Sequence, residues 1–235
     1  MKHFKNFKTC VYCTAQTLAS LDETTLARDY AYLEKYVGID KVYLETYRDG
    51  TWVAIDHMKM IQNFFKEHGV EIAGGITTVT PPLEKDDVTR QRLFQTFCYS
   101  NETMRTYLKK IVTYTAELFD EIILDDFFFT SCTCDDCLRE RSNLSWAEFR
   151  SKKMIDVAEN LVLKPAKLAN PSVKVTIKYP NWRESYHETG YVPKIQPSMF
   201  DKIYTGTETR NTAHTDQHLP RYLSYSIMRY MEHVA

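Results

Sequence analysis

Glycine is scarce in this sequence, and neither sign of charge is in excess. Only seven of the 235 residues are glycine, and no glycine-rich turn follows the first predicted strand, so a phosphate-cradling loop is not indicated. The 30 basic and 31 acidic residues are mixed along the chain and give a net charge of -1. This balance argues against nucleic acid or an anionic membrane as partner and favours a small or uncharged one.

Long hydrophobic runs are also missing. The charged N-terminal segment, residues 1–8, is not followed by an apolar stretch, so we predict neither a signal peptide nor a membrane span, and expect a cytoplasmic location. The chain has six cysteines, but three of them fall within six residues, which is unlike a secreted disulfide framework in a chain of this size. Metal ligation is the better first interpretation of these cysteines.

The sequence does contain a regular alternation of β-type runs and stretches with helical periodicity. Such alternation is typical of βαβ units and a parallel sheet. Helices are predicted over residues 22–38, 53–68, 100–118 and 146–168, with Pro165 kinking or ending the last. The six runs rich in Val, Ile, Tyr or Thr are residues 9–14, 41–47, 71–78, 121–127, 173–179 and 202–207.

This pattern predicts a single α/β domain over residues 1–235, a partial (β/α)₈ barrel of the TIM type. Six β/α units leave such a barrel two units short of closure, so we expect two more units downstream of the amphipathic segment at residues 221–235. An open, doubly wound sheet is the alternative that needs no further units. In a barrel, the loops after the strands build the active site, and the long loop at residues 79–97 is expected to contribute.

A Cys-x-Cys-x-x-Cys run follows the fourth predicted strand, and one more cysteine lies at the start of the preceding helix. Four thiolates are enough to hold Zn²⁺ in tetrahedral geometry, at about 2.3 Å per bond. The alternative is a set of reduced thiols without a metal. Cys10 and Cys13 are expected to be core residues, because alternation along a strand points them to opposite faces. The four cysteines of the predicted metal site are Cys98, Cys132, Cys134 and Cys137.

Residues 97–150 resemble family 42 glycoside hydrolases. The likeness rests on residues 97–102, which run into a helix with Arg105 and Ile111, then on a strand that ends in acids, and on the cysteine run. Members of that family, mostly β-galactosidases, are (β/α)₈ barrels with a four-cysteine zinc site. The resemblance implies that the four cysteines named above ligate a structural zinc ion.

The chain departs from that family at its acids. The family has an Asn-Glu pair at the end of the fourth strand, with the Glu as general acid, where this chain has Asp125 and Asp126. The family's nucleophile lies on a seventh strand, which this chain does not contain. The two aspartates followed by Phe127 also resemble the Asp-Asp-aromatic signature of other barrel hydrolases. The likeness therefore supports fold and metal better than a particular sugar.

Hydrolysis of a glycosidic bond needs two carboxyl groups across the sugar, roughly 5–5.5 Å apart for retention and 6.5–9.5 Å for inversion. Asp125 and Asp126 are predicted to point to opposite faces of their strand, with Asp126 at the mouth as acid or nucleophile and Asp125 positioning it. The second carboxylate is predicted to be Glu208, near Arg210, or a residue beyond this chain. A purely structural pair of Glu208 with Arg210 is the alternative.

Other side chains at predicted strand ends are expected to contact substrate. The sequence is rich in aromatics, with 16 Tyr, 12 Phe and 3 Trp, and aromatic faces suit sugars. His214 and His218 lie in a polar loop and are not expected to bind a metal. The predicted substrate contacts are Glu45, Tyr47, Arg48, Thr77, Thr78, Lys178, Tyr179, Trp182 and Arg210.

These features together predict a glycoside hydrolase similar to β-galactosidases, with a carbohydrate substrate, a structural zinc ion and no nucleic-acid or membrane partner. The sequence does not specify an oligomeric state. A non-catalytic carbohydrate-binding or scaffold barrel is the alternative from another class, and the loss of the usual Glu favours it. A catalytic zinc is a third interpretation, but four thiolates leave no open position for water.

Overall fold

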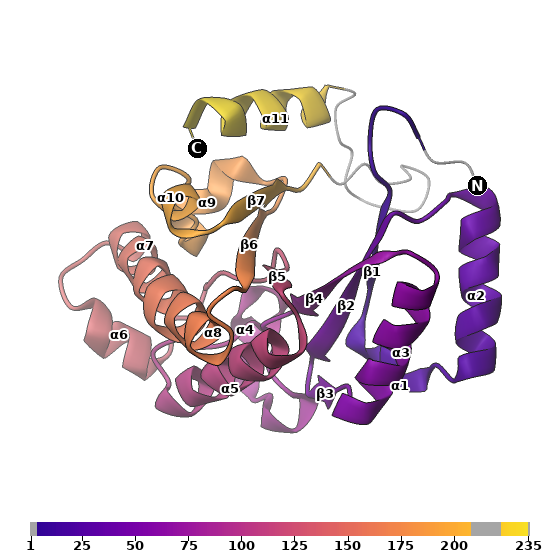
Figure 1. The fold of residues 1–235 in the computed structure, drawn as a ribbon. Coiled ribbons are helices and arrows are strands. Elements are labelled where there is room, and N and C mark those ends of the chain that lie inside the picture. The colour runs from indigo at the N-terminus through magenta and orange to yellow at the C-terminus, as the bar shows by residue number, and fades with distance from the viewer. Residues whose placement is uncertain (1–3, 208–221, 235) are drawn as a thin grey trace.

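A computed structural model describes residues 4–207 and 222–234 as one curved sheet with helices packed along it (Figure 1). The strands are β1 (Cys10–Cys13), β2 (Lys41–Arg48), β3 (Thr51–Trp52), β4 (Glu71–Ile76), β5 (Glu121–Leu124), β6 (Lys174–Tyr179) and β7 (Lys202–Thr205).

The strand order identifies the architecture. Along the sheet the order is β1-β2-β4-β5-β6-β7, every neighbouring pair on this path is parallel, and β3 pairs antiparallel with the end of β2. A doubly wound sheet reverses its strand order at a switch point, whereas this order follows the chain throughout. The predicted partial barrel is therefore confirmed, and the doubly wound alternative is wrong.

Most predicted helices are present, with local sequence signals at their ends. Asp22 caps α2 in a capping box with Thr25, and Asn101 caps α5 by accepting from the backbone N–H of Met104. The longer helices are α2 (Glu23–Tyr36), α3 (Ile55–Glu67), α5 (Glu102–Leu118), α7 (Trp146–Val157) and α11 (Leu223–Val234).

The helix predicted over residues 146–168 changes its winding near its end. It consists of α7, a π-helical segment η3 (Ala158–Leu163) and α8 (Lys164–Ala169). Pro165 has no N–H to donate and lies in the first turn of α8, where a proline is tolerated. The proline thus marks the beginning of α8 rather than the end of a helix.

Short elements fill the segments predicted as loops. The segment at residues 79–97 contains η1 (Pro82–Glu84), α4 (Asp87–Gln91) and η2 (Leu93–Gln95), and its two ends are joined by a bridge between Val79 and Thr96. The remaining short helices are α1 (Ala15–Ser20), α6 (Asp135–Arg141), η4 (Arg183–Ser185), α9 (Tyr186–Thr189) and α10 (Gln196–Met199).

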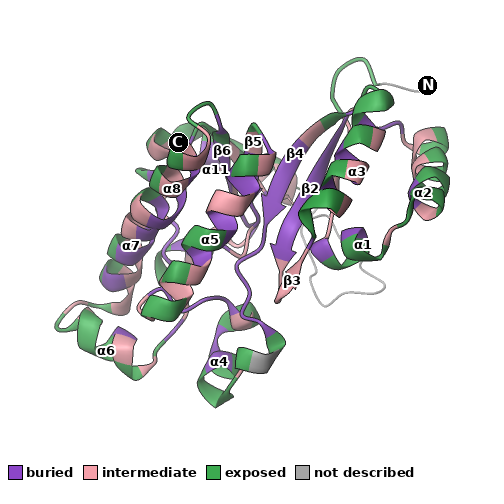
Figure 2. Cartoon of the chain, turned by 60° about the horizontal axis from the view of Figure 1, so that its bottom comes forward, coloured by how far each residue is buried: buried purple, intermediate pink, exposed green. Residues whose placement is uncertain are grey.

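The two faces of the sheet differ in character. One face packs against the helices in the main core, which includes Leu44, Leu124 and Ile177, and Figure 2 shows β2 and β4 buried beneath helices with exposed outer faces. The other face lines the barrel interior with a smaller apolar group that includes Tyr43 and Ile123. The interior is therefore apolar at mid-height, with polar layers above and below it.

The two outer strands come close across that interior. The Tyr204 ring of β7 lies 6.0 Å from the Tyr43 ring of β2, and its hydroxyl lies 3.9 Å from the Cys10 sulfur of β1. Cys13 packs half-buried against the main core as expected, whereas Cys10 is exposed, so the expectation of a core residue is wrong for Cys10. In the described part of the chain, no helix is both long and apolar enough to cross a membrane.

Candidate active site and metal site

Glu45 anchors a network of charged side chains at the C-terminal edge of β2, β5 and β6. Its carboxylate is fully buried and accepts hydrogen bonds from the Tyr12 hydroxyl (2.8 Å), the Ala15 N–H (2.7 Å) and the Thr77 hydroxyl. Arg48 Nε lies 3.0 and 2.8 Å from its two oxygens. Because all these donors belong to the protein, Glu45 positions Arg48 and does not face a ligand, which corrects the expectation of a substrate contact.

Two cations link this anchor to the predicted aspartates. Arg48 Nη2 donates to Asp125 Oδ2 at 3.0 Å, and Lys178 Nζ lies 3.0 Å from a carboxylate oxygen of both Asp125 and Asp126. β5 ends at Leu124, so the two aspartates lie in the turn beyond it and share one ammonium group. The expectation that they point to opposite faces of a strand is therefore wrong.

The cations are the more accessible part of the network. The side chains of Arg48 and Lys178 are 21% and 25% exposed, against 10% and 14% for Asp125 and Asp126. Burial works against the charge of Lys178, but Asp125 and Asp126 outweigh it and raise its pKa above the usual value. The lysine therefore stays charged at neutral pH.

Tyr12 and Arg48 also keep fixed protonation states. Burial, followed by the charges of Glu45 and Asp125, raises the pKa of the Tyr12 hydroxyl well above its usual value, so this group remains a donor. Burial opposes the charge of Arg48, but hydrogen bonding and charge from Glu45 raise its pKa as well. Three carboxylates against two cations leave the network with one negative charge, which disfavours an anionic ligand.

A β-bulge explains why Tyr47 does not reach the mouth. Between Glu45 and Tyr47, β2 advances by two residues while β4 advances by one, so the alternation of faces is shifted there. Tyr47 is fully buried on the helix side, where its hydroxyl donates to the Val79 carbonyl (3.0 Å) and its ring packs against Trp52. The prediction of a substrate contact at Tyr47 is wrong.

Tyr179 and Trp182 belong to an aromatic cluster beneath the loops. Tyr179 follows Lys178 on β6, points to the opposite face, and is fully buried. Trp182 packs its ring against Phe129 (5.3 Å between centroids) and Tyr191 (5.7 Å). Tyr179 is therefore not placed to stack on a sugar at the strand edge, which corrects that prediction, whereas Trp182 is partly exposed and its contact with substrate stays a prediction.

The remaining predictions fall into two groups. Thr77 and Thr78 are buried: Thr77 donates to Glu45, and Thr78 donates to the Phe127 carbonyl at 2.7 Å. The two threonines therefore stabilise the C-terminal edge of the sheet from inside the protein. Four predictions lie outside the described residues, namely those for Glu208, Arg210, His214 and His218.

Phe94 is a site residue that the sequence analysis missed. Its ring is 58% exposed and lies 5.2 Å from the Phe127 ring, which in turn packs under the Arg48 guanidinium at 5.4 Å. Phe94 has φ 51°, in the left-handed region that bulky residues rarely adopt, and no sequence signal marks this conformation. An exposed aromatic ring thus lies next to the charged network.

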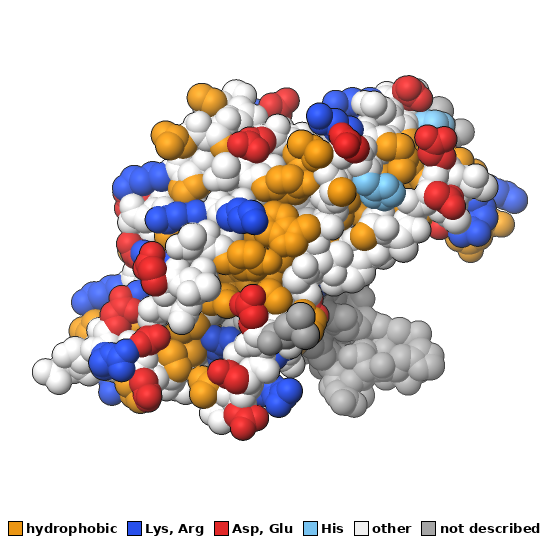
Figure 3. Space-filling model, turned by 90° about the horizontal axis from the view of Figure 1, so that it is seen from below, with side chains coloured by type: hydrophobic (Ala, Val, Ile, Leu, Met, Phe, Trp, Pro, Cys, Tyr) orange, Lys and Arg blue, Asp and Glu red, His pale blue; other side chains and the backbone are white. Residues whose placement is uncertain are grey.

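The molecule seen from below also offers apolar surface. β3 lies at the lower end of β2 in Figure 1, so the C-terminal end of β2 points toward the viewer in Figure 3. Hydrophobic side chains gather in a band across the middle of that face, with Lys and Arg side chains along one border (Figure 3).

The four predicted cysteines form one cluster. Cys98 Sγ lies 3.7 Å from the sulfurs of both Cys134 and Cys137, and all four sulfurs, including that of Cys132, lie within 4.8 Å of one another. Tetrahedral ligation at about 2.3 Å per bond places sulfurs about 3.8 Å apart, which matches these separations. The cluster could therefore hold a metal ion, and it joins the segment before α5 to the segment after β5.

The sulfurs of the cluster shift one another's pKa values in opposite directions, and hydrogen bonding with Cys132 raises the pKa values of Cys98 and Cys137 above the usual value. Hydrogen bonds from the Cys137 and Cys98 thiols hold the pKa of Cys132 well below its usual value. Cys98, Cys132 and Cys137 are buried, and Phe149 of α7 packs against them. This small core is separate from the main one.

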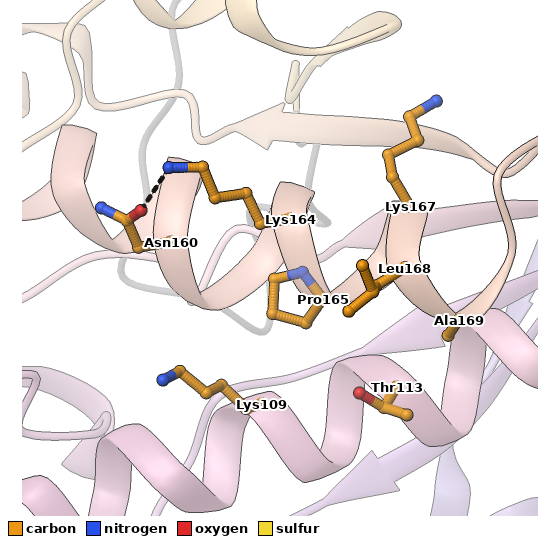
Figure 4. Close-up of a pocket in the computed structure, with 8 residues that line it drawn as sticks. All are labelled: Lys109, Thr113, Asn160, Lys164, Pro165, Lys167, Leu168 and Ala169. Carbon is orange, nitrogen blue, oxygen red and sulfur yellow. Dashed lines mark hydrogen bonds between the residues drawn. The ribbon is translucent and has the colours of Figure 1, made fainter.

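A groove of about 830 Å³ lies on the outer helical layer, away from these sites (Figure 4). It runs between α5, which contributes Lys109 and Thr113, and the η3–α8 segment, where Lys164 donates to Asn160 at 2.7 Å. No side chain of the charged network or the cysteine cluster lines it. The groove therefore plays no part in the chemistry at the strand edge.

Fold and strand edge together define a barrel of the kind in which enzymes carry their active sites at the C-terminal ends of the strands. The chain belongs to the family described as "Probable glycosyl hydrolase, catalytic domain", which it matches over residues 1–235. It is 32% identical, over 252 aligned positions and 97% of its length, to the uncharacterized protein SSO3021 of Saccharolobus solfataricus. The chain spans 40% of the length of that relative.

A solved structure shares the fold. The cold-adapted β-galactosidase from Rahnella sp. R3 superposes with a TM-score of 0.64 at 12% sequence identity, covering 91% of this chain and 41% of the β-galactosidase. At this identity, the likeness concerns the fold alone.

Proposed function

We propose that this domain hydrolyses a glycosidic bond at the C-terminal edge of its sheet, with Asp126 as a reacting carboxylate. One observation carries the proposal: Asp125 and Asp126 converge on Lys178, next to Arg48 and the exposed Phe94, at the edge where barrel enzymes bind substrates. Membership of a glycosyl hydrolase family supports the same conclusion.

The ion pairs suggest a division of roles. Asp126 lies 3.0 Å from Lys178, which favours an ionised carboxylate, and an ionised carboxylate suits a nucleophile or base better than a general acid. Asp125 bonds both Lys178 and Arg48, so it acts as a positioning residue between the two cations. The general acid is then Glu208 or a residue outside this chain.

The substrate is a neutral carbohydrate in this proposal, with a β-galactoside as the first to test. The single negative charge of the network opposes a carboxylated sugar, while Arg48 and Lys178 have donors for sugar hydroxyls. Phe94 supplies an apolar face for one side of the sugar ring.

The test is a panel of aryl glycosides, including a β-galactoside and a glucuronide, assayed with the full-length protein. Asp126→Asn is expected to lower kcat by about 10²–10⁴-fold, because the carboxylate acts on the reacting atoms. Asp87→Asn is the control, since Asp87 is 94% exposed and pairs only with Arg90 among the described residues. An Asp126→Asn variant as active as wild type would overturn the assignment.

A non-catalytic carbohydrate-binding barrel is the second candidate. Two observations favour this second candidate. Asp126 already pairs with Lys178, and its side chain is shorter than that of the glutamate found in similar barrels. Wild-type protein that binds a sugar in calorimetry but releases no aryl group from any glycoside in the panel would support this candidate instead.

We propose further that the cysteine cluster holds Zn²⁺ as a structural ion. The sulfur separations suit a tetrahedral site, and four thiolates fill it, so no position is left for a reacting water. Cys98, Cys132, Cys134 and Cys137 would hold the ion, and its contribution would be to stabilise the two segments that they join. About one zinc per chain is expected after dialysis.

A further inference from the structure

Arg92 is a buried cation that forms no salt bridge in the described part of the chain, although its charge, after the hydrogen bonds from Thr89, helps to lower the pKa of the Asp86 carboxyl. Arg92 as a whole is 8% exposed, and its Nε is buried and makes no hydrogen bond within the described residues. Nη2 donates to the hydroxyls of Thr80 (3.2 Å) and Thr89 (2.8 Å), and Nη1 donates to the sulfur of Cys132 at 3.8 Å. Among the described residues, the Cys132 sulfur is thus the one hydrogen-bond partner of this guanidinium that a bound metal would make anionic.

Charge balance explains why an arginine lies there. A buried cation is costly unless an anion compensates it, and four neutral thiols would provide none. A divalent ion with four thiolates carries two negative charges, so a neighbouring cation stabilises it. Arg150 lies close by as well, because its Nη2 donates to the carbonyl of Ser131, the residue before Cys132, at 3.1 Å.

Arg92 also holds the segment that carries Phe94. Its carbonyl accepts from the Gln95 N–H (3.0 Å), and its Thr80 contact joins it to the beginning of the segment. The next residue, Leu93, donates its N–H to Ser131 Oγ at 2.8 Å. Phe94 and Gln95 both have positive φ, at 51° and 55°, so surrounding contacts must maintain this backbone.

We infer that Arg92 is a positioning residue that couples the metal site to the mouth: it compensates the thiolate charge and thereby fixes the segment at residues 79–97, with Phe94 at the strand edge. The inference rests on the metal proposed for the cysteine cluster. Loss of the metal, or of the guanidinium, releases this segment.

The test compares four full-length proteins: wild type, Arg92→Met, Arg92→Lys and the control Arg90→Met, whose arginine is 65% exposed and lies in the same segment. Zinc affinity is measured by competition with a chromophoric chelator. Cleavage by chymotrypsin after Leu93 and Phe94, which all four proteins retain, is followed by mass spectrometry with and without chelator.

Arg92→Met is expected to bind zinc about tenfold or more weakly, in the range typical of groups that support metal ligands. Its cleavage at Phe94 should be roughly tenfold faster than in zinc-loaded wild type, matching wild type after chelation. Arg92→Lys keeps the charge and tests the inference should Arg92→Met fail to fold. Its zinc affinity and its cleavage rate at Phe94 should lie between those of wild type and Arg92→Met. Arg90→Met should behave as wild type.

Two results would overturn the inference, and they are distinguishable. If the wild-type protein binds no zinc, both the proposed metal site and the inference are wrong. Wild type with zinc, together with an Arg92→Met or Arg92→Lys protein that keeps wild-type zinc affinity and wild-type resistance at Phe94, would overturn the inference alone. Neither result depends on glycosidase activity.

Discussion

Phe94 is the residue whose conformation is hardest to explain by packing alone. A phenylalanine with φ 51° and a ring 58% exposed gains little from burial, and left-handed backbone costs a bulky residue on the order of 1–3 kcal/mol. Its ring lies edge-on to Phe127 and Phe129, next to the charged network. Strain of this kind is concentrated at sites that bind ligands, so Phe94 is a candidate sugar platform.

Phe94→Ala is expected to raise KM for a cleaved aryl glycoside by roughly 2- to 12-fold, the equivalent of ~0.5–1.5 kcal/mol of aromatic contact, with little change in kcat. Steady-state kinetics on the full-length protein measures both constants. Leu93→Ala is the matched control, since Leu93 is 52% exposed and adjacent, and it should leave KM unchanged. An unchanged KM in Phe94→Ala would exclude the platform role.

At the residue scale, the sequence predicted which residue types lie at the site better than it predicted where their side chains point. The aspartate pair and the cysteine run carry chemistry in their side chains, and both lie at the predicted edge. Tyr47 was assigned to the wrong face because the bulge at the end of β2 leaves no mark in the residue pattern. Tyr179 was assigned wrongly because only one of two neighbours on a strand can face the mouth.

At the scale of elements, a buried ion layer joins three strands near their N-terminal ends. Glu121 of β5 accepts from Lys41 of β2 at 2.6 Å and from Lys202 of β7 at 2.7 Å. The side chains of Glu121 and Lys41 are 16% and 10% exposed. Burial raises the pKa of Glu121, but the hydrogen bonds and charges of the two lysines outweigh it, so its pKa lies below the ordinary value of 4.5.

Because the folded-state pKa of Glu121 is depressed, its contribution to stability is present above pH 4.5 and is lost as the pH falls through the lower folded value. Glu121→Gln should therefore lower the free energy of unfolding by about 1–3 kcal/mol at neutral pH. The difference from wild type should shrink steadily below pH 4.5. Urea unfolding at several pH values measures it.

Glu71→Gln is the control for this prediction. Glu71 pairs with Lys8 at the surface, where the side chains are 55% and 65% exposed, so its removal should have little effect at any pH. A Glu121→Gln defect that stays constant from neutral to acidic pH would point to packing rather than charge.

The sequence predicted the long elements and missed the short ones. All six parallel strands were found because each predicted run is rich in Val, Ile, Tyr or Thr and is flanked by helical periodicity. β3 has two residues and α1 has six, which is too short for a periodic pattern. The elements within residues 79–97 were also missed, although the capping aspartate Asp86 before α4 was a usable signal.

At the scale of the whole molecule, the cysteine cluster ties together segments that the sheet leaves apart. Cys98 precedes α5, while Cys132 to Cys137 follow β5, and the cluster packs against α7. The segment of Cys98 contributes Phe97 and Tyr99 to the main core, whereas no residue between Thr130 and Ser145 belongs to that core. Metal ligation, where present, therefore stabilises the side of the domain on which the proposed chemistry occurs.

Removal of the metal is expected to destabilise the domain rather than merely inhibit it. A ligand that binds only the folded state, at a free concentration 100 to 1,000 times its Kd, adds about 2.7–4.1 kcal/mol to the free energy of unfolding. Chelation should therefore lower Tm by roughly 5–15 °C in a domain of this size. Differential scanning fluorimetry with and without chelator measures the shift. Cys134→Ser should have a lowered Tm without chelator, whereas Cys10→Ser, outside the cluster, should retain the full chelator-dependent shift. A wild-type Tm that chelation leaves unchanged would mean that the fold holds the four sulfurs together without a metal, through packing around Phe149 and the hydrogen bonds of the neighbouring segments.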